Sequence, residues 1–186
     1  TINGPGLTLL RNPVGDLTNN GTITTVAGAV TASLNLTSTG TITGSATAGT
    51  TMTNSGVITG NATASNGLLD NQATGTIGGN AISTLSAITN SGMITGSATA
   101  GTVLTNSGTI TINATASNGL LDNQATGTIG GNAISTLSAI TNSGMITGSA
   151  TAGTVLTNSG TITINATASN GLLDNQATGT IGGNAI

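Results

Sequence analysis

Residues 104–111 read LTNSGTIT, and variants of this octapeptide recur along the chain. Its centre is a Gly-x-Ile step, usually preceded by Asn-Ser. The glycines of these steps are separated by 19, 16, 19, 17, 16, 19, 17, 16 and 19 residues, at Gly21, Gly40, Gly56, Gly75, Gly92, Gly108, Gly127, Gly144, Gly160 and Gly179. A short unit that recurs at this spacing indicates a repeat protein of about ten stacked coils.

A longer repeat encloses the short one. Residues 67–118 recur without change as residues 119–170, and residues 171–186 begin a third copy, so the period is 52 residues. Three successive coils of 17, 16 and 19 residues fill one such period. The sequence therefore predicts a three-coil superrepeat in which equivalent coils are identical.

The residues inside a coil alternate as they do in β-strands. Thr-Ile-Thr at residues 109–111 and Ala-Thr-Ala at residues 98–100 place apolar or small residues on one face and hydroxyls on the other. Thr and Ile favour strands, whereas the 30 glycines at regular intervals disfavour helices. We expect an all-β fold, a β-solenoid.

One isoleucine per coil lies at a fixed position, two residues after the glycine. When the coils stack in register, these side chains form one inward aliphatic ladder along the rod. The ladder comprises Ile23, Ile42, Ile58, Ile77, Ile94, Ile110, Ile129, Ile146, Ile162 and Ile181.

An asparagine precedes the same glycine by two or four residues. Stacked amides can hydrogen-bond to their copies in neighbouring coils, which predicts a second, structural ladder at a bend; ligand binding is the functional alternative. Every third turn is longer and reads Asn-Gln-Ala-Thr-Gly, which predicts an insertion at one corner. Ser38 replaces the amide in one coil, and the other members are Asn19, Asn54, Asn71, Asn90, Asn106, Asn123, Asn142, Asn158 and Asn175.

The coil lengths also bear on the type of solenoid. Left-handed helices built of hexapeptides keep a period of 18, so coils of 16 to 19 residues favour a right-handed parallel β-helix. Ten coils at a strand spacing of about 4.8 Å give a rod of roughly 48 Å. Residues 1–40, which include Pro5, Arg11 and Pro13, are expected to form an irregular cap or joint with the first coil, and residues 41–186 the regular solenoid, continuing beyond the C-terminus.

Composition restricts the core and the partners. The chain has no Phe, Tyr or Trp, and 35% hydrophobic residues, so its core must be narrow and aliphatic. One arginine and four aspartates leave no basic patch for nucleic acid or an anionic membrane, and no apolar run is long enough to insert into a bilayer. With only 3% charged residues, copies lack the repulsion that keeps proteins apart, which favours self-association.

The motif at residues 104–111 resembles the repeats of bacterial surface β-solenoids, notably autotransporter passenger domains and large haemagglutinin-type adhesins. The resemblance covers nearly all of the chain from Leu17 onward. It implies a secreted rod displayed at the bacterial cell surface or in an extracellular filament. Because the chain lacks an initiator Met and stops within a repeat, we expect a piece of a longer protein, with its export signal and anchor elsewhere. The exact 52-residue duplication and the low charge favour a fibre-forming variant.

Catalytic chemistry has few candidate residues. Asp16, Asp70, Asp122 and Asp174 are the only acids, and the last three recur once per superrepeat. At three coils apart they would be about 14 Å from one another, beyond the spacing of paired glycosidase carboxylates. The oxygen-rich stretches at residues 70–72 and 78–80 lack the repeat pattern of calcium-binding β-rolls. We expect no catalytic, cofactor or metal site, and no enzyme.

Three functional hypotheses follow from these features. The first is a structural fibre or surface filament whose partner is another copy of the chain, joined end to end or laterally. The second is a passive adhesin stalk, with contacts to a host surface or matrix made by domains absent from this sequence. The third is ice binding by Thr-x-Thr arrays, although the pair after the glycine is intact only at Thr22/Thr24, Thr41/Thr43, Thr109/Thr111 and Thr161/Thr163.

Overall fold

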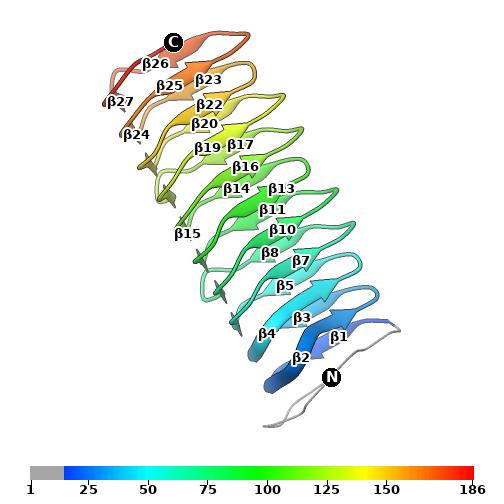
Figure 1. Ribbon diagram of the computed structural model, residues 1–186. Coiled ribbons are helices and arrows are strands. Elements are labelled where there is room, and N and C mark those ends of the chain that lie inside the picture. Colours follow the sequence, from blue (N-terminus) through cyan, green and yellow to red (C-terminus); the bar gives the residue numbers. More distant parts are fainter. Residues whose placement is uncertain (1–14) are drawn as a thin grey trace.

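The computed structural model describes residues 15–186, apart from the side chains of residues 25–28, and all its regular elements are β-strands. They wind into a parallel β-solenoid with coils of about 17 residues (Figure 1). The fold class predicted from the spacing of the glycines is confirmed. Pro5, Arg11 and Pro13, assigned to the expected cap, lie outside the described residues.

One face of the rod is a ten-stranded parallel sheet with one strand from each coil, which makes nine turns between its first and last strands. Each strand is three residues long, with its outer residues buried and its middle residue facing outward until the last coil. In order these strands are β1 (Leu17–Asn19), β3 (Leu36–Ser38), β5 (Met52–Asn54), β8 (Leu69–Asn71), β11 (Ile88–Asn90), β14 (Leu104–Asn106), β17 (Leu121–Asn123), β20 (Ile140–Asn142), β23 (Leu156–Asn158) and β26 (Leu173–Asn175).

The Gly-x-Ile steps form a second face. Its strands are two residues long because the glycine of the turn precedes them and another turn follows. They are β6 (Val57–Ile58), β9 (Thr76–Ile77), β12 (Met93–Ile94), β15 (Thr109–Ile110), β18 (Thr128–Ile129), β21 (Met145–Ile146), β24 (Thr161–Ile162) and β27 (Thr180–Ile181).

Alanine-rich strands form the third face. They are β7 (Ala62–Ala64), β10 (Ala81–Ser83), β13 (Ala98–Ala100), β16 (Ala114–Ala116), β19 (Ala133–Ser135), β22 (Ala150–Ala152) and β25 (Ala166–Ala168). In the first two coils the second and third faces are joined within single longer strands, β2 (Thr22–Ala32) and β4 (Thr41–Ala48). Strands on the front of Figure 1 run to the right and those behind return to the left as the chain rises, which is the right-handed sense.

The joined strands β2 and β4 contain the main irregularity of the described chain. Thr24 pairs with Thr43 and Ala29 with Ser45, so four residues of β2 stand opposite Gly44 alone. Gly44 has φ 118°, a backbone conformation that side chains other than glycine rarely adopt. The pairing register therefore shifts by three residues at this corner. In the ten-stranded sheet the pairing runs from β1 through β3 to β5 in unbroken register.

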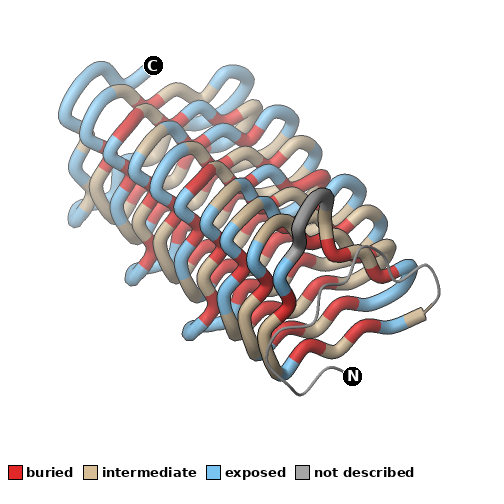
Figure 2. The backbone as a smooth tube through the Cα atoms, turned by 60° about the horizontal axis from the view of Figure 1, so that its bottom comes forward, coloured by how far each residue is buried: buried red, intermediate tan, exposed pale blue. Residues whose placement is uncertain are grey.

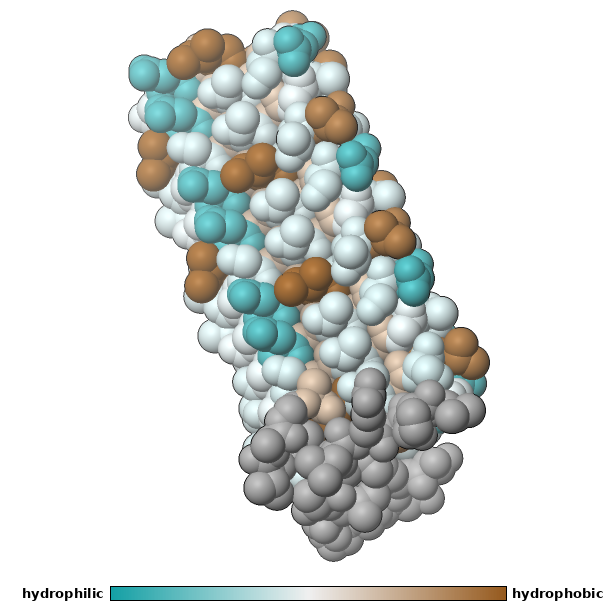
Figure 3. Space-filling view, turned by 45° about the vertical axis from the view of Figure 1, so that its right-hand side comes forward, coloured by the Kyte–Doolittle hydropathy of each residue, from teal (hydrophilic) through white to brown (hydrophobic). Residues whose placement is uncertain are grey.

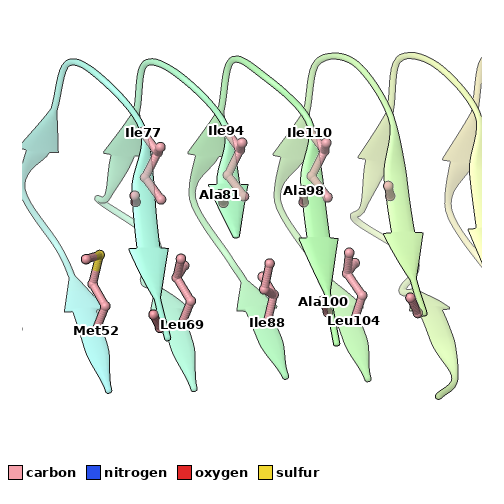
Figure 4. Packing of buried hydrophobic residues seen from close by; sticks show 14 of the residues in the cluster. Met52, Leu69, Ile77, Ala81, Ile88, Ile94, Ala98, Ala100, Leu104 and Ile110 are labelled. Atoms are coloured by element: carbon pink, nitrogen blue, oxygen red, sulfur yellow. The ribbon is translucent and has the colours of Figure 1, made fainter. Parts of the chain in front are cut away.

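The core consists of single columns of side chains that run the length of the rod. Ile77, Ile94 and Ile110 stack in one column, and Met52, Leu69, Ile88 and Leu104 in a second (Figure 4). Small buried alanines from the third face complete the core. Buried positions lie along the faces of the rod and exposed positions gather at its corners (Figure 2). Each face contributes a single layer of side chains to the interior, so the space between the faces is narrow. Aliphatic side chains fill it without aromatic residues.

The glycine of each Gly-x-Ile step is required by how closely the coils approach. A Cβ atom on Gly108 would overlap the carbonyl oxygen of Gly92 in the coil before it. Gly56, Gly92, Gly144 and Gly160 face the preceding coil in the same way. At this corner backbone therefore packs directly on backbone, and any side chain would push two coils apart.

Candidate functional site

The asparagines before each turn form a buried hydrogen-bonded ladder. Nδ2 of Asn90 donates to Oδ1 of Asn106 at 2.8 Å, and Nδ2 of Asn106 donates to Oδ1 of Asn123 at 2.8 Å. The same amide of Asn106 also donates to the carbonyl oxygens of Gly108 and Thr128. From Asn19 to Asn158 the ladder amides are fully buried inside the rod, so they are not accessible to a ligand.

The members of this ladder from Asn19 to Asn158 are buried, and so are the ladder isoleucines from Ile23 to Ile162. Asn175 is exposed and Ile181 half-buried because they lie in the last coil, which has no coil stacked beyond it. The rod therefore holds both sets as continuous columns up to its final turn.

The ladder has one defect. Ser38 accepts from Nδ2 of Asn19 at 3.2 Å but donates its hydroxyl to the carbonyl oxygen of Gly40 at 3.3 Å. Oδ1 of Asn54, the next member, is consequently buried without a hydrogen-bond partner, the single such side-chain atom within residues 15–186. The interface between these two coils lacks one hydrogen bond that the other ladder contacts have.

The longer turns leave the ladder intact. Nδ2 of Asn71 reaches the carbonyl oxygen of Gly75, four residues ahead, as well as Oδ1 of Asn90. Gly75 N–H closes the turn on the carbonyl oxygen of Gln72, and the hydroxyl of Thr74 donates to the carbonyl oxygen of Ser55 in the previous coil. The inserted residues are therefore held as an outward loop at one corner of every third coil.

A second polar ladder, which the sequence patterns did not single out, runs along another corner. Oδ1 of Asn61 accepts from Asn80 N–H at 2.8 Å, and Oδ1 of Asn80 accepts from Ser97 N–H at 2.8 Å. Both Ser and Asn occur as the acceptor in this ladder, so the column is not a repeat of one residue type. Its spacing of 16, 19 and 17 residues would have revealed it, through Ser45, Asn61, Asn80, Ser97, Asn113, Asn132, Ser149, Asn165 and Asn184.

The aspartates stand singly on the outer face of the ten-stranded sheet. Asp70 lies in register between Thr53 and Thr89, and Asp122 between Thr105 and Thr141. Their side-chain contacts are to neighbouring glutamines, as from Nε2 of Gln72 to Oδ2 of Asp70 at 3.3 Å. Two threonine-bearing strands separate successive aspartates, so the face carries a sparse row of negative charges without paired carboxylates.

Asp16 is used differently. Its Oδ1 accepts from both the backbone N–H and Nδ2 of Asn35, each at 3.0 Å, in the next coil. A carboxylate that accepts two such bonds fixes the corner between the first two coils.

In the two stretches considered for calcium, the asparagine oxygens are engaged elsewhere. Oδ1 of Asn71 accepts from Asn54 inside the rod, and Oδ1 of Asn80 accepts from Ser97 N–H. Within the described part of the chain no three acidic, histidine or cysteine side chains gather as a metal site, and no pocket is present.

The threonine pairs expected for an ice-binding array lie on the second face. Thr111 and Thr163 are exposed and their partners Thr109 and Thr161 half-buried. Met93 and Met145 interrupt one column, and Gly78, Gly130 and Gly182 interrupt the other. The paired hydroxyls therefore occur as isolated patches.

Apolar side chains on the outside are also scattered. On the face of the rod in Figure 3 they form separate spots surrounded by small polar residues. The spots recur with the superrepeat, since Leu85 and Leu137, 65% and 66% exposed, are 52 residues apart.

No helix among residues 15–186 has the length and apolar character to cross a membrane. Comparison with models of protein families, with curated proteins and with solved structures yields no match to this chain.

Proposed function

We propose that the chain is a structural protein, without enzymatic activity, that self-associates into an extracellular fibre or surface filament. The observation that carries this proposal is the composition of the interface between coils. It consists of backbone hydrogen bonds, aliphatic columns and amide ladders, with no ion pair among the described residues. Such an interface has no charge pattern that would reject a second copy of the same surface.

The surface that each coil presents to the next supports stacking of one copy on another. In the last coil Leu173 and Ile181 are half-buried and Nδ2 of Asn175 bonds only to the carbonyl oxygen of Gly179 in its own turn. A further coil, from continuing chain or from another copy, would cover these groups as each coil covers the one before.

The long faces support lateral contact. Their outward positions are mainly threonine, serine and glycine, with single aspartates three strands apart. Close approach of two such faces desolvates few charges, and small side chains allow the sheets to come near each other.

The test is the assembly state of the purified chain. It is measured by sedimentation velocity at several protein concentrations, by negative-stain microscopy and by fibre diffraction. Filaments with a meridional spacing of about 4.8 Å support the fibre. Two matched variants separate the modes of growth: Ile181→Lys charges the last coil, and Thr105→Lys charges a side face. The first should stop end-to-end growth and the second lateral bundling, while circular dichroism stays unchanged.

The stalk hypothesis predicts the opposite result in the same experiment, namely that the chain does not assemble. Separate rods of roughly 50 Å at all concentrations, unaffected by either lysine, would contradict self-association. Adhesion would then reside in other parts of the protein. For both hypotheses we propose export from a bacterial cell, and fractionation of cells producing the full-length protein tests that location.

A further inference from the structure

We propose that Asn66, Asn118 and Asn170 are sites of spontaneous deamidation, which places one new carboxylate in each superrepeat along one corner of the rod. Each of these residues precedes a glycine, in the identical sequence NATASNGLLD at residues 61–70, 113–122 and 165–174. All three asparagines are exposed. Water is the only co-reactant.

The reaction begins with the backbone nitrogen that follows the asparagine. The Gly119 nitrogen loses its proton and attacks Cγ of Asn118; a C–N bond forms, the Cγ–Nδ2 bond breaks, and ammonia leaves with that proton. The resulting succinimide ring takes up water and opens to aspartate or isoaspartate. Glycine favours the attack because it has no side chain to obstruct the nitrogen.

The structure leaves this nitrogen available. Gly67, Gly119 and Gly171 donate no hydrogen bond from their backbone N–H within residues 15–186. The side chain of Asn118 is held by one contact, from Nδ2 to the carbonyl oxygen of Gly101 at 2.9 Å, at a solvent-facing corner. The corresponding contacts of Asn66 and Asn170 are 2.9 and 3.0 Å.

The ladder asparagines are protected at both reacting atoms. Ser107 N–H, which follows Asn106, donates to the carbonyl oxygen of Asn90 at 2.8 Å, and Ser143 N–H, after Asn142, donates to that of Asn123. The carboxamides are buried and bonded across coils. Folding therefore adds to the difference that glycine, which has no side chain, already makes at the corner pairs.

Asn20-Gly21 provides a control of identical chemistry. Here Gly21 N–H donates to Oδ1 of Asn19 at 3.3 Å, and Oδ1 of Asn20 accepts from the hydroxyl of Thr39 at 3.1 Å. The nucleophile and the carboxamide are both engaged, so this pair should react more slowly than the three corner pairs.

Deamidation changes the charge of a nearly neutral rod. Three conversions, one negative charge each, take the formal net charge from −3 to −6 (−3 − 3). The new carboxylate at residue 118 also faces the carbonyl oxygen of Gly101, which formerly accepted a hydrogen bond from Nδ2. The corner contact is lost at each modified coil.

The experiment incubates the purified, folded chain at mildly alkaline pH and follows its intact mass, its charge on native gels and its elastase peptides by mass spectrometry. The expected result is a gain of about 1 Da per event and up to three events in the NATASNGLLD peptides, with ladder peptides slower by roughly tenfold or more. The peptide that carries Asn3-Gly4, another Asn-Gly pair, lies outside the described residues and is scored separately. In a urea-unfolded sample Asn20-Gly21 should react as fast as the three corner pairs, and the ladder peptides should keep only the smaller difference that follows from the residue after the asparagine. The triple variant Asn66→Gln, Asn118→Gln, Asn170→Gln should lose these three events, because ring closure is much slower from glutamine.

Two outcomes overturn the proposal. One is equal rates at corner and ladder asparagines in the folded chain. The other is an unreactive corner under conditions in which a synthetic peptide of the same sequence deamidates, since the turn would then protect the site.

Discussion

Oδ1 of Asn54 is buried without a hydrogen-bond partner because Ser38, its neighbour in the preceding coil, directs its hydroxyl to the carbonyl oxygen of Gly40. Elsewhere in the ladder that oxygen accepts from an asparagine amide, as Asn71 does from Asn54 at 2.9 Å. The mismatch is a local cost that a single substitution can remove.

Replacing Ser38 by Asn should stabilise the rod. The new amide would donate to Asn54 and its oxygen would accept from Asn19, as in the other coils. We expect the free energy of unfolding to rise by about 1 to 2 kcal/mol and the melting temperature by about 2 to 4 °C per kcal/mol. Thermal melts check this, with Ser38→Ala as the control that lacks the donor. A lower melting temperature for Ser38→Asn would show that the site cannot hold an amide.

Removing a ladder amide should have the opposite effect. Asn106→Ala leaves Oδ1 of Asn123 without its donor and Nδ2 of Asn90 without its shortest acceptor. We expect a loss of about 2 to 4 kcal/mol. Thr105→Ala, on the outward side of the same strand, should cost less than about 1 kcal/mol.

Native-state hydrogen exchange is the measurement for these two variants, because it reports the loss of protection coil by coil. Faster exchange should be concentrated in the coils around residue 106. Equal effects of the two substitutions would mean that the buried amides contribute no more than a surface hydroxyl.

Ile110 and Ile112 offer a matched pair for the aliphatic core, since Ile110 is buried and Ile112 is 48% exposed. Ile110→Asp should open the neighbouring coils by burying an unpaired carboxylate. Ile112→Asp should change stability by no more than about 0.5 kcal/mol. Limited proteolysis with elastase should cut the first variant near the substitution and leave the second as resistant as the parent. Unaltered proteolysis of Ile110→Asp would show that this isoleucine does not point inward.

Gly108→Ala tests the close packing of backbone at the corner. The added methyl group would collide with the Gly92 carbonyl, and overpacking of this kind costs about 1 to 3 kcal/mol or more. Ser107→Ala, one residue earlier, loses only contacts at 3.2 to 3.4 Å and should be nearly neutral. Urea unfolding of the two variants gives the comparison, and a neutral Gly108→Ala would indicate looser stacking.

Excision of residues 67–118 should leave a correctly folded, shorter rod. The join brings Asn66 before Gly119, which reproduces the sequence at every former junction. The rod should shorten by about 14 Å, three strand spacings, with stability per coil retained. Small-angle X-ray scattering measures the length. A deletion two residues shorter, of residues 67–116, shifts the columns and should give a rod with a disrupted junction; equal scattering from both would contradict the fixed register.

Much of this architecture could be predicted from the chain alone because the Gly-x-Ile step marks the phase of each coil. Once Gly108 and Ile110 are aligned with Gly92 and Ile94, the isoleucine and asparagine columns follow from the spacing. The structure places these residues in register, Ile94 beside Ile110 and Asn90 beside Asn106.

Other features were hidden by variation at equivalent positions. The first column of the ten-stranded sheet passes from Met52 to Leu69 to Ile88, three residue types that fill similar volumes. The corner ladder has two Asn after each Ser, since either oxygen can accept from a backbone N–H. The bulge opposite Gly44 arises from tertiary pairing between two coils, for which a single strand sequence carries no marker.

The missing bond between Ser38 and Asn54 also determines how the rod should respond to force. The interstrand hydrogen bonds run along the rod axis, so tension between its ends loads the coil interfaces in series. Each interface that yields releases a coil of about 17 residues. The coil's length along the rod then increases from one strand spacing to the length of an extended chain, about 56–61 Å. Rupture should therefore begin at the interface with the unpaired amide and proceed in equal steps, so that the rod dissipates work through lengthening before it breaks.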